Sequence, residues 1–389
     1  MDLFNQLHNL AEERANQYPL KDYPGKQKFK KKLSEFADLI IKQSENVQIN
    51  EQALSLCEKF RNNPVFICGY YKTGTSLLNS LLDFHPQAVV LLPGSKILFG
   101  VNHKAEKLSQ DEFFNYLARE YIQSLYNPTG HLPIDLLDSM RTKKYTEFVA
   151  YLRYFIKNAN NKKELLSALP CALFFVNGQF ERGDIPAIWV EKSVTNERHI
   201  KTAKQIFPNA KFIYIARNPY DNLASIKRWY INSGRKNVSS IYMYFTGLKK
   251  SLQNAEENQS NNFISVKYED IVQNTENEIK KIANFLNINH TDSMQSPTII
   301  GIPDRPNTSD TKEKNREASG VVLTSRVSKY KQTLTQREIK NITIIFSELI
   351  KKLGYQLDAT SSKYKFLILL PLKLKVEFST LLLRIRNRI

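Results

Sequence analysis

A short glycine-containing loop carries the clearest chemical signal in the sequence. It reads Gly69-Tyr70-Tyr71-Lys72-Thr73-Gly74-Thr75-Ser76, follows the apolar stretch 65–68 and leads into a leucine-rich segment. A strand, a turn and a helix in this order direct backbone N–H groups and the positive end of the helix dipole at one point. Lys72 and the loop hydroxyl groups would add positive charge and further donors. The loop is therefore typical of a site that binds a phosphate-like anion.

This loop differs from the one that nucleoside triphosphatases use. Its two glycines have the right separation, but Thr75 stands where the Walker A pattern has lysine, and the lysine lies inside the loop at position 72. The sequence offers no convincing acidic partner for magnesium at the end of a following strand. We therefore expect Lys72 to supply positive charge directly, without a metal. A surface turn with incidental glycine and threonine is the alternative interpretation of this motif taken alone.

A second anion motif follows a later apolar stretch, residues 212–216. Arg217-Asn218-Pro219 comes directly after it, and Ser225 stands eight residues beyond the arginine. Arginine is costly to bury at a strand end unless it meets an anion, and its planar fork suits a phosphate bidentately. Ser225, on the following helix, can present a hydroxyl to the same group. An arginine paired with a core carboxylate is the alternative.

Together, the two motifs resemble the family of sulfotransferases that use 3′-phosphoadenosine 5′-phosphosulfate (PAPS). That family carries G-x-x-[KR]-[ST]-G-[ST]-[ST] after its first strand and R-[DN]-P-x-D-x-x-x-S after a later one, and both occur here in order. Three further stretches agree with the family pattern: 189–196, 266–272 and 352–355. The resemblance covers roughly residues 63 to 357.

The resemblance implies a donor site and a mechanism. The chemistry would be an in-line displacement at sulfur, in which catalysis is mostly positioning and electrostatic stabilisation. Lys72 would neutralise the leaving oxygen, and Lys192, in a segment that matches the family's [DE]-K-[TS]-x-x-N motif, would be a second electrostatic group. A salt bridge between Lys192 and Glu191 is the alternative. The residues expected to hold the 5′-phosphosulfate are Lys72, Thr73, Gly74, Thr75 and Ser76, and those expected to hold the 3′-phosphate are Arg217 and Ser225.

The catalytic base is not evident from the sequence. Related enzymes place Glu or His on the segment after the first helix, but here that segment contains Pro93-Gly94-Ser95. His103, Glu106 and Glu191 are the candidates that could substitute. His85 lies just after the first helix, where we expect it to pack or to cap the helix end.

The wider pattern predicts the elements that would position these residues. Short β-rich runs alternate with amphipathic segments from about residue 63 to 357, which indicates an α/β, three-layer fold with a central parallel sheet. We expect strands at 65–68, 188–190, 212–216 and 263–266, and helices around 77–82, 279–286 and 339–353, the last ended by Gly354. Residues 297–319 are expected to form a long loop.

Three regions follow from this pattern. Residues 1–62 are expected to form a helical N-terminal extension, 63–358 a sulfotransferase domain, and 359–389 a basic amphipathic tail. The tail has two interpretations of equal weight: it lies on an anionic membrane surface, or it covers the core or an oligomer contact.

Composition narrows the partners and the compartment. The net charge of +18 attracts polyanions, but the basic excess lies substantially near the chain ends and no nucleic-acid motif is present, so we expect no nucleic-acid partner. Three cysteines without CxxC spacing argue against a disulfide framework and a zinc site. No signal peptide or spanning stretch is evident, so we expect a cytoplasmic protein, with membrane association left open by the tail.

The acceptor is not identified by the sequence. A hydroxyl or amine of a carbohydrate, a lipid or a small metabolite would each fit the chemistry. The principal rival is a P-loop kinase or another nucleotide-binding protein without sulfotransfer activity, and a catalytically inactive family member is a further one.

Overall fold

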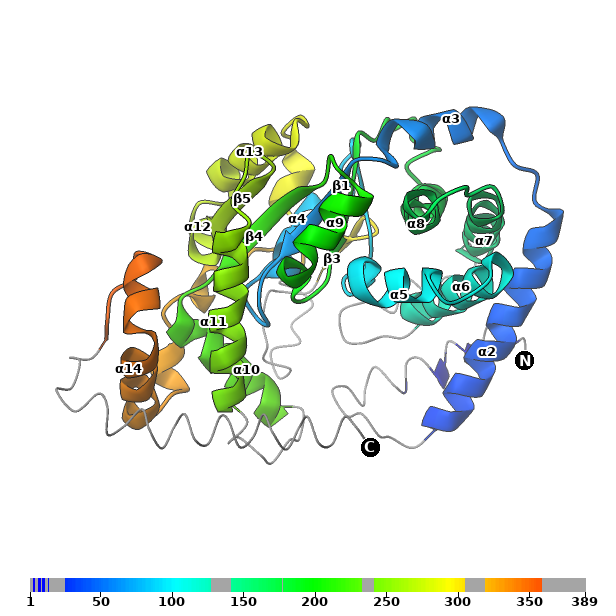
Figure 1. Cartoon of the computed structure of the whole chain (residues 1–389). Helices are drawn as coiled ribbons and strands as arrows, with labels where there is room; N and C mark the ends of the chain where they lie inside the picture. Colours follow the sequence, from blue (N-terminus) through cyan, green and yellow to red (C-terminus); the bar gives the residue numbers. More distant parts are fainter. Residues whose placement is uncertain are drawn as a thin grey trace.

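Five parallel strands form the centre of the fold (Figure 1). Their order in the sheet is β2-β3-β1-β4-β5. The strands are β1 (Pro64–Cys68), β2 (Ala88–Val90), β3 (Ile188–Lys192), β4 (Lys211–Ala216) and β5 (Phe263–Lys267). The four strands expected from the sequence are confirmed, and β2 is one that the sequence pattern did not reveal, because it is only a short apolar run. The expected α/β fold with a central parallel sheet is confirmed.

The computed structural model describes most, but not all, of the chain. Described are residues 25–126, 141–176, 178–232, 241–304 and 319–358, with Leu3, Gln6, Leu7, Asn9, Leu10 and Glu13 near the start. The predicted basic tail, 359–389, lies outside the described residues. Among those described, no helix has the length and apolar character needed to cross a membrane.

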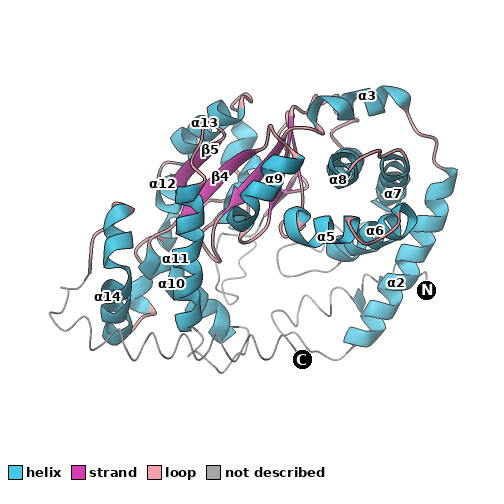
Figure 2. Cartoon of the chain, viewed as in Figure 1, coloured by secondary structure: helices cyan, strands magenta, loops and turns pink. Residues whose placement is uncertain are grey.

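Side chains alternate between the two faces of the sheet, as the period of a strand requires. Val65 and Ile67 of β1 face one apolar cluster, while Phe66 and Cys68 face the other. The first cluster lies under α4 (Thr75–Leu82), α12 (Tyr268–Gln273) and α13 (Thr275–Leu286). The second lies under α9 (Ile200–Ile206), α10 (Pro219–Asn232) and α11 (Ile241–Glu257). Helices on both faces of one sheet give the three layers seen in Figure 2.

The strand order indicates where along the sheet a ligand site is expected. The chain leaves β1 toward β2 on one side, and leaves β4 toward β5 on the other, so the connections diverge between the adjacent strands β1 and β4. In open α/β sheets, ligands bind outside the carboxyl ends of the strands at such a point. The loops that begin at Gly69 and Arg217 flank this position.

A large helical layer stands beside the sheet (Figure 1). Between β2 and β3 the described residues, 91–126, 141–176 and 178–187, contain helices and no strand, which departs from the regular strand–helix alternation expected there. They are η2 (Ile97–Val101, a π-helical turn), α5 (Asn102–Ala105), α6 (Gln110–Tyr126), α7 (Arg141–Lys157) and α8 (Lys162–Val176). The departure follows from composition, because α7 and α8 bury aromatic side chains such as Tyr151 and Phe175, whose rings stack.

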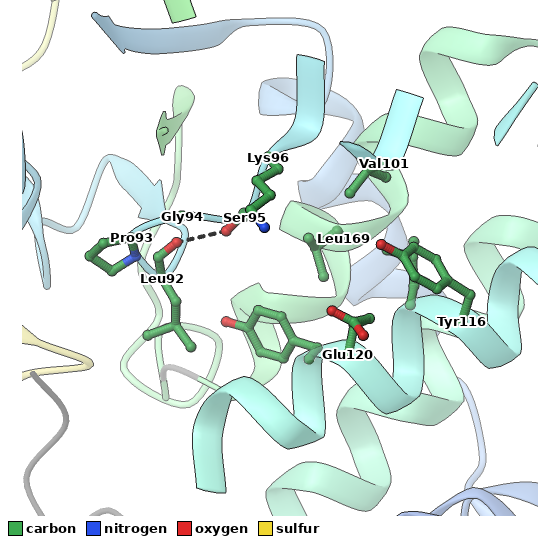
Figure 3. A pocket seen from close by; sticks show the side chains of 11 residues that line it. Leu92, Pro93, Gly94, Ser95, Lys96, Val101, Tyr116, Glu120 and Leu169 are labelled. Carbon is green, nitrogen blue, oxygen red and sulfur yellow. Dashed lines mark hydrogen bonds between the residues drawn. The ribbon is translucent and has the colours of Figure 1, made fainter. Parts of the chain in front are cut away.

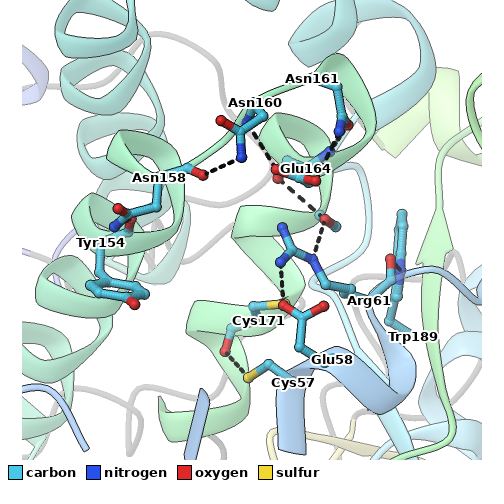
Figure 4. A network of polar contacts seen from close by, with 11 residues as sticks. Cys57, Glu58, Arg61, Tyr154, Asn158, Asn160, Asn161, Glu164, Cys171 and Trp189 are labelled. Atoms are coloured by element: carbon cyan, nitrogen blue, oxygen red, sulfur yellow. Dashed lines mark hydrogen bonds and ion pairs between the residues drawn. The ribbon is translucent and has the colours of Figure 1, made fainter. Parts of the chain in front are cut away.

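The N-terminal helices belong to this layer. Helix α2 (Lys26–Gln43) packs on α6 and α7, and a short 3-10 turn, η1 (Ser44–Asn46), leads toward α3 (Glu51–Phe60). Figure 4 shows how the end of α3 is joined to α8 and the sheet: Arg61 Nε donates to Ser167 Oγ (3.5 Å), and Trp189 Nε1 donates to the Arg61 carbonyl (3.0 Å). All three cysteines are free and buried.

The C-terminal helix closes the described domain. Helix α14 (Gln336–Lys352) begins with a capping box between Thr335 and Glu338 and packs on α10. Gly354 adopts φ 72°, and Tyr355 N donates to the Ile350 carbonyl (2.9 Å), which is a Schellman ending. The predicted glycine stop is therefore confirmed. Three short 3-10 turns complete this part: η6 (Asp292–Gln295), η8 (Thr324–Arg326) and η9 (Tyr330–Gln332).

The expected long loop at 297–319 is partly wrong. Its first residues form a two-stranded hairpin, β6 (Thr298–Ile299) and β7 (Ile302–Pro303), while 305–318 lie outside the described residues. The hairpin is held by the buried carboxylate of Asp83, which accepts hydrogen bonds from Thr298 Oγ1 (2.8 Å) and the amide of Gly301 (2.9 Å). This partner lies far away in sequence, so local turn-forming residues alone suggested a loop.

Candidate functional site

The loop after β1 has the backbone shape that its glycines predict. Gly69 has φ 148°, and a Cβ there would stand 2.7 Å from Thr73 Oγ1. Gly74, which precedes α4, has φ 106°, and a Cβ there would stand 2.3 Å from Cδ2 of Tyr268. Side chains are therefore excluded at both positions. The first amides of α4 have no partner within the helix, so this compact turn aims them at the carboxyl edge of the sheet.

Neighbouring segments hold the loop through its backbone. Arg217 Nη1 donates to the Lys72 carbonyl (2.9 Å), and Asn222 Nδ2 donates to the Tyr71 carbonyl (2.7 Å). From the side of β3, the amide of Gly69 donates to Glu197 Oε2 (3.1 Å). The two sequence motifs are thus parts of one structure, since the second motif supplies donors to the first.

The loop after β4 is shaped by its own residues. Asn218 Oδ1 accepts a hydrogen bond from the amide of Tyr220 (3.0 Å), which caps α10. Pro219 occupies the first position of the helix, where its fixed φ is favourable and its missing N–H costs nothing. The guanidinium of Arg217 lies over the ring of Tyr268, 4.1 Å from its centroid. Arg217 is 7% exposed and is therefore held in one place at the strand end.

Three cationic side chains meet at this edge. Burial and the charges of Lys192 and Arg217 lower the pKa of Lys72 to about 8. Burial likewise lowers the pKa of Lys192 to about 8, against the charge of Glu191, which raises it. Holding like charges together in a buried place is costly unless an anion neutralises them. The arrangement is therefore built for a polyanionic ligand.

The predicted donor-site residues with hydroxyl groups lie in the Lys72 loop, in α4 and in α10. Thr73 is buried, and its hydroxyl donates to the Tyr70 carbonyl (2.8 Å), so part of its role is to shape the loop. Thr75 and Ser76 stand in the first turn of α4, and Ser225 is buried in the second turn of α10. The structure thus brings Lys72, Lys192 and Arg217 together and places the hydroxyl residues on the helices that start beside them.

Glu191 occupies a buried junction between loops. Its carboxylate accepts hydrogen bonds from Ser193 Oγ (2.5 Å), Asn196 Nδ2 (2.7 Å) and the amide of Lys96 (3.1 Å). Asn196 also donates to the carbonyl of Ile67 (3.1 Å). The prediction that Glu191 acts on the acceptor stays untested, but these contacts favour a role in holding the loops after β2 and β3 against β1.

The remaining base candidates lie elsewhere. His103 is exposed on α5, and Glu106 forms an exposed ion pair with Lys162, which lowers the pKa of Glu106. His85 is fully buried, and its two ring nitrogens contact the carbonyl of Asn289 (2.8 Å) and the amide of Gln87 (3.0 Å). Burial lowers the pKa of His85, which fits the packing role expected for it.

A pocket opens between the loop after β2 and α6 (Figure 3). Its volume is about 170 Å³. The loop after β2 forms one wall and is closed on itself, since Ser95 Oγ donates to the Leu92 carbonyl (2.6 Å). It is joined to β3 by the amide of Gly94, which donates to the Lys192 carbonyl (2.7 Å). The lining residues are Leu92, Pro93, Gly94, Ser95, Lys96, Val101, Tyr116, Leu117, Glu120, Tyr121 and Leu169.

Glu120 is a pocket residue that the sequence pattern did not indicate. Among the described residues that line the pocket, it is the one carboxylate, and it projects from α6 (Figure 3). No local motif marks it, because its neighbours follow an ordinary amphipathic helix pattern. In the part of the chain that the structure describes, no group of three or more His, Cys, Asp or Glu side chains is placed to hold a metal ion.

Solved structures with related folds come from several sources. The sulfotransferase domain of the olefin synthase from Synechococcus PCC 7002 matches with 15% identity and a TM-score of 0.46, covering 76% of this chain and 95% of that one. Sulfotransferase STF9 from Mycobacterium avium matches with 14% identity and a TM-score of 0.41, covering 92% and 93%. Mouse sulfotransferase SULT7A1, solved with PAP, matches with 17% identity and a TM-score of 0.39, covering 78% and 90%. A search of curated proteins finds no match.

The assignment of the chain rests on its sequence. Residues 64–292, more than half of the chain, match the model of the sulfotransferase family. The matched region contains the Lys72 loop, Lys192 and the Arg217 motif. With its sequence match and its site geometry in agreement, this chain belongs to the sulfotransferase family.

Proposed function

We propose that this chain transfers the sulfuryl group of PAPS to a hydroxyl or amine acceptor. The observation that carries the proposal is the meeting of Lys72, Lys192 and Arg217 at the carboxyl edge of the sheet. Lys72 is partly buried and Lys192 is buried there, and the pKa of each is lowered to about 8. PAPS carries negative charge at two separate points, the 5′-phosphosulfate and the 3′-phosphate. The Lys72 loop with α4 fits the first, and Arg217 with Ser225 on α10 fits the second.

The proposed reaction is a single displacement at sulfur. The acceptor oxygen or nitrogen forms a bond to sulfur while the bond between sulfur and the 5′-phosphate oxygen breaks. The electron pair of that bond stays on the phosphate oxygen, and adenosine 3′,5′-bisphosphate leaves. Lys72 and Lys192 stabilise this developing charge, and a base takes the acceptor proton.

The pocket beside Lys192 is the proposed acceptor site. Its volume of about 170 Å³ is similar to that of a cavity of about 150 Å³ that holds benzene. Leu92, Val101 and Leu169 supply apolar walls. The part of the acceptor that approaches the sulfur is therefore proposed to be compact and apolar, such as a ring or a short chain bearing the reacting group.

Glu120 is the proposed base. Its exposed side chain lines this pocket, whereas Glu191 is enclosed by its hydrogen-bond donors, and His103 and Glu106 do not line the pocket. A carboxylate on α6 would supply the group that the loop Pro93-Gly94-Ser95 lacks.

Ligand binding tests the donor site first. Adenosine 3′,5′-bisphosphate is expected to raise the melting temperature of the protein, because a ligand that binds only the folded state stabilises it by about 2.7 kcal/mol at a hundred times its Kd. Arg217→Ala should lose most of this shift, while the exposed Lys59→Ala should keep it. A shift with magnesium–ATP and none with the bisphosphate would instead support a nucleoside triphosphate-binding protein.

Lys72→Ala tests the role of the loop lysine in turnover. Transfer of radiolabelled sulfate from PAPS to phenol or to water is expected to fall by about 10²- to 10³-fold, the usual cost of removing one group that stabilises transition-state charge. The unliganded variant should fold at least as well, since the substitution removes a charge repelled by Lys192 and Arg217. Near-normal turnover in the folded variant would contradict the assignment.

The affinity for the bisphosphate is expected to depend on pH. Below about pH 7 both lysines are charged, so their titration should not change the affinity with pH. Above about pH 8 the free protein loses these protons while the bound anion favours the charged forms, so Kd should rise by up to about tenfold per pH unit for each lysine. Titration calorimetry in buffers of different ionisation enthalpy would detect the proton uptake. Lys192→Met should reduce this uptake, and affinity that is constant from about pH 7 to 9.5 would contradict the electrostatic model.

Glu120→Gln tests the base. The variant should lower kcat for transfer to phenol by about 10²-fold or more, the usual contribution of a positioned base, and leave the Kd for the bisphosphate unchanged. Asp111→Asn, at the exposed start of the same helix, is the matched control. An unchanged kcat in Glu120→Gln would remove Glu120 from the mechanism without affecting the donor site.

A further inference from the structure

The turn that ends α14 contacts the segment that carries Arg217. Tyr355 donates its hydroxyl hydrogen to Glu269 Oε2 (2.5 Å). The other oxygen of the same carboxylate, Oε1, accepts a hydrogen bond from the amide of Asn218 (3.0 Å). Glu269 is buried, so both of its oxygens are used inside the protein. The carboxylate therefore links the C-terminal turn to the residue next to Arg217.

Glu269 contacts Asn218, and the preceding residue, Tyr268, contacts Arg217. Tyr268, directly before Glu269, stacks on the Arg217 guanidinium at 4.1 Å. The same ring touches the space that a side chain at position 74 would need. A displacement of Glu269 would therefore move the ring that supports Arg217 and the wall beside Gly74.

Tyr355 is itself fixed in position. The Schellman ending sets its backbone, and Lys267 Nζ lies 5.0 Å from the centroid of its ring. Burial and the charge of Glu269 raise the pKa of the Tyr355 phenol, so its hydroxyl stays protonated as a donor. The family match ends at residue 292, before this turn, and so assigns no role to Tyr355.

We propose that Tyr355 is a positioning residue for the 3′-phosphate of the donor: it holds Glu269, which fixes the Asn218 amide and, through Tyr268, the Arg217 guanidinium. The proposal rests on the proposed function, because it requires a donor with a 3′-phosphate. It makes the C-terminal turn part of donor recognition, although that turn lies outside the two anion motifs.

Comparison of two nucleotides in Tyr355→Phe tests the proposal. Adenosine 3′,5′-bisphosphate carries the 3′-phosphate and adenosine 5′-monophosphate lacks it, so their Kd ratio measures recognition of that group. The variant keeps the ring and loses one hydrogen bond to a carboxylate. We expect its Kd for the bisphosphate to rise about tenfold and its Kd for the monophosphate to change less than about twofold. The KM for PAPS should rise similarly, with kcat within about threefold of the parent value.

Controls separate positioning from general destabilisation. Tyr154→Phe, in the helical layer, should change neither Kd. In a Glu269→Gln background, Tyr355→Phe should have a smaller effect than in the parent protein, because the two residues act through one contact. An equal loss of affinity for both nucleotides, or an unchanged ratio, would overturn the proposal and leave the sulfotransferase function standing. A parent protein with no preference for the bisphosphate would overturn both.

Discussion

The site depends on the forced proximity of three positive charges. The charges lie at the ends of three adjacent strands: Lys72 in the loop after β1, Lys192 at the end of β3 and Arg217 directly after β4. The parallel register brings these strand ends to one edge of the sheet, because Ile67 pairs with Lys192, and Cys68 pairs with Tyr214. The sheet thereby fixes the backbone positions from which the three side chains extend. These like charges repel one another, and a bound anion would relieve that repulsion, so the cost of gathering them would contribute to the affinity for an anion.

Three buried carboxylates around the site each accept a hydrogen bond from the backbone of a loop. Glu191 accepts from the amide of Lys96, Glu197 from Gly69, and Glu269 from Asn218. Each therefore holds a loop at the carboxyl edge. Had these groups formed direct ion pairs with the lysines, the cluster would have been neutralised and the anion would have had to compete. The loops are thereby held rigid while the positive field is largely retained.

Features made by residues close together in the chain could be predicted from the sequence, whereas features made by distant residues could not. The Lys72 loop and the Arg217 motif were recognisable because each is contiguous, and four of the five strands were visible as apolar runs. Glu120 and the Tyr355–Glu269 contact were not, since their significance arises only when residues far apart in the chain meet. The helical segment after β2 was missed for a related reason: its helices bury one another, so the pattern did not show that they interrupt the strand–helix alternation. The hairpin at 298–303 likewise depends on Asp83, a distant residue.

The position of the helical layer has a consequence for how such a protein can diversify. Its segment runs from residue 91 to 187 and supplies every lining residue found for the pocket, whereas Lys72, Lys192 and Arg217 lie outside this segment. The segment is linked to their surroundings through the Gly94 amide on the Lys192 carbonyl and the Lys96 amide on Glu191. On the proposed function, selectivity for the acceptor would come from one continuous segment of the chain. Substitutions in this segment outside residues 93–96 would change the pocket and leave the three cationic side chains in place, so a single scaffold could acquire new acceptors while keeping the proposed donor site.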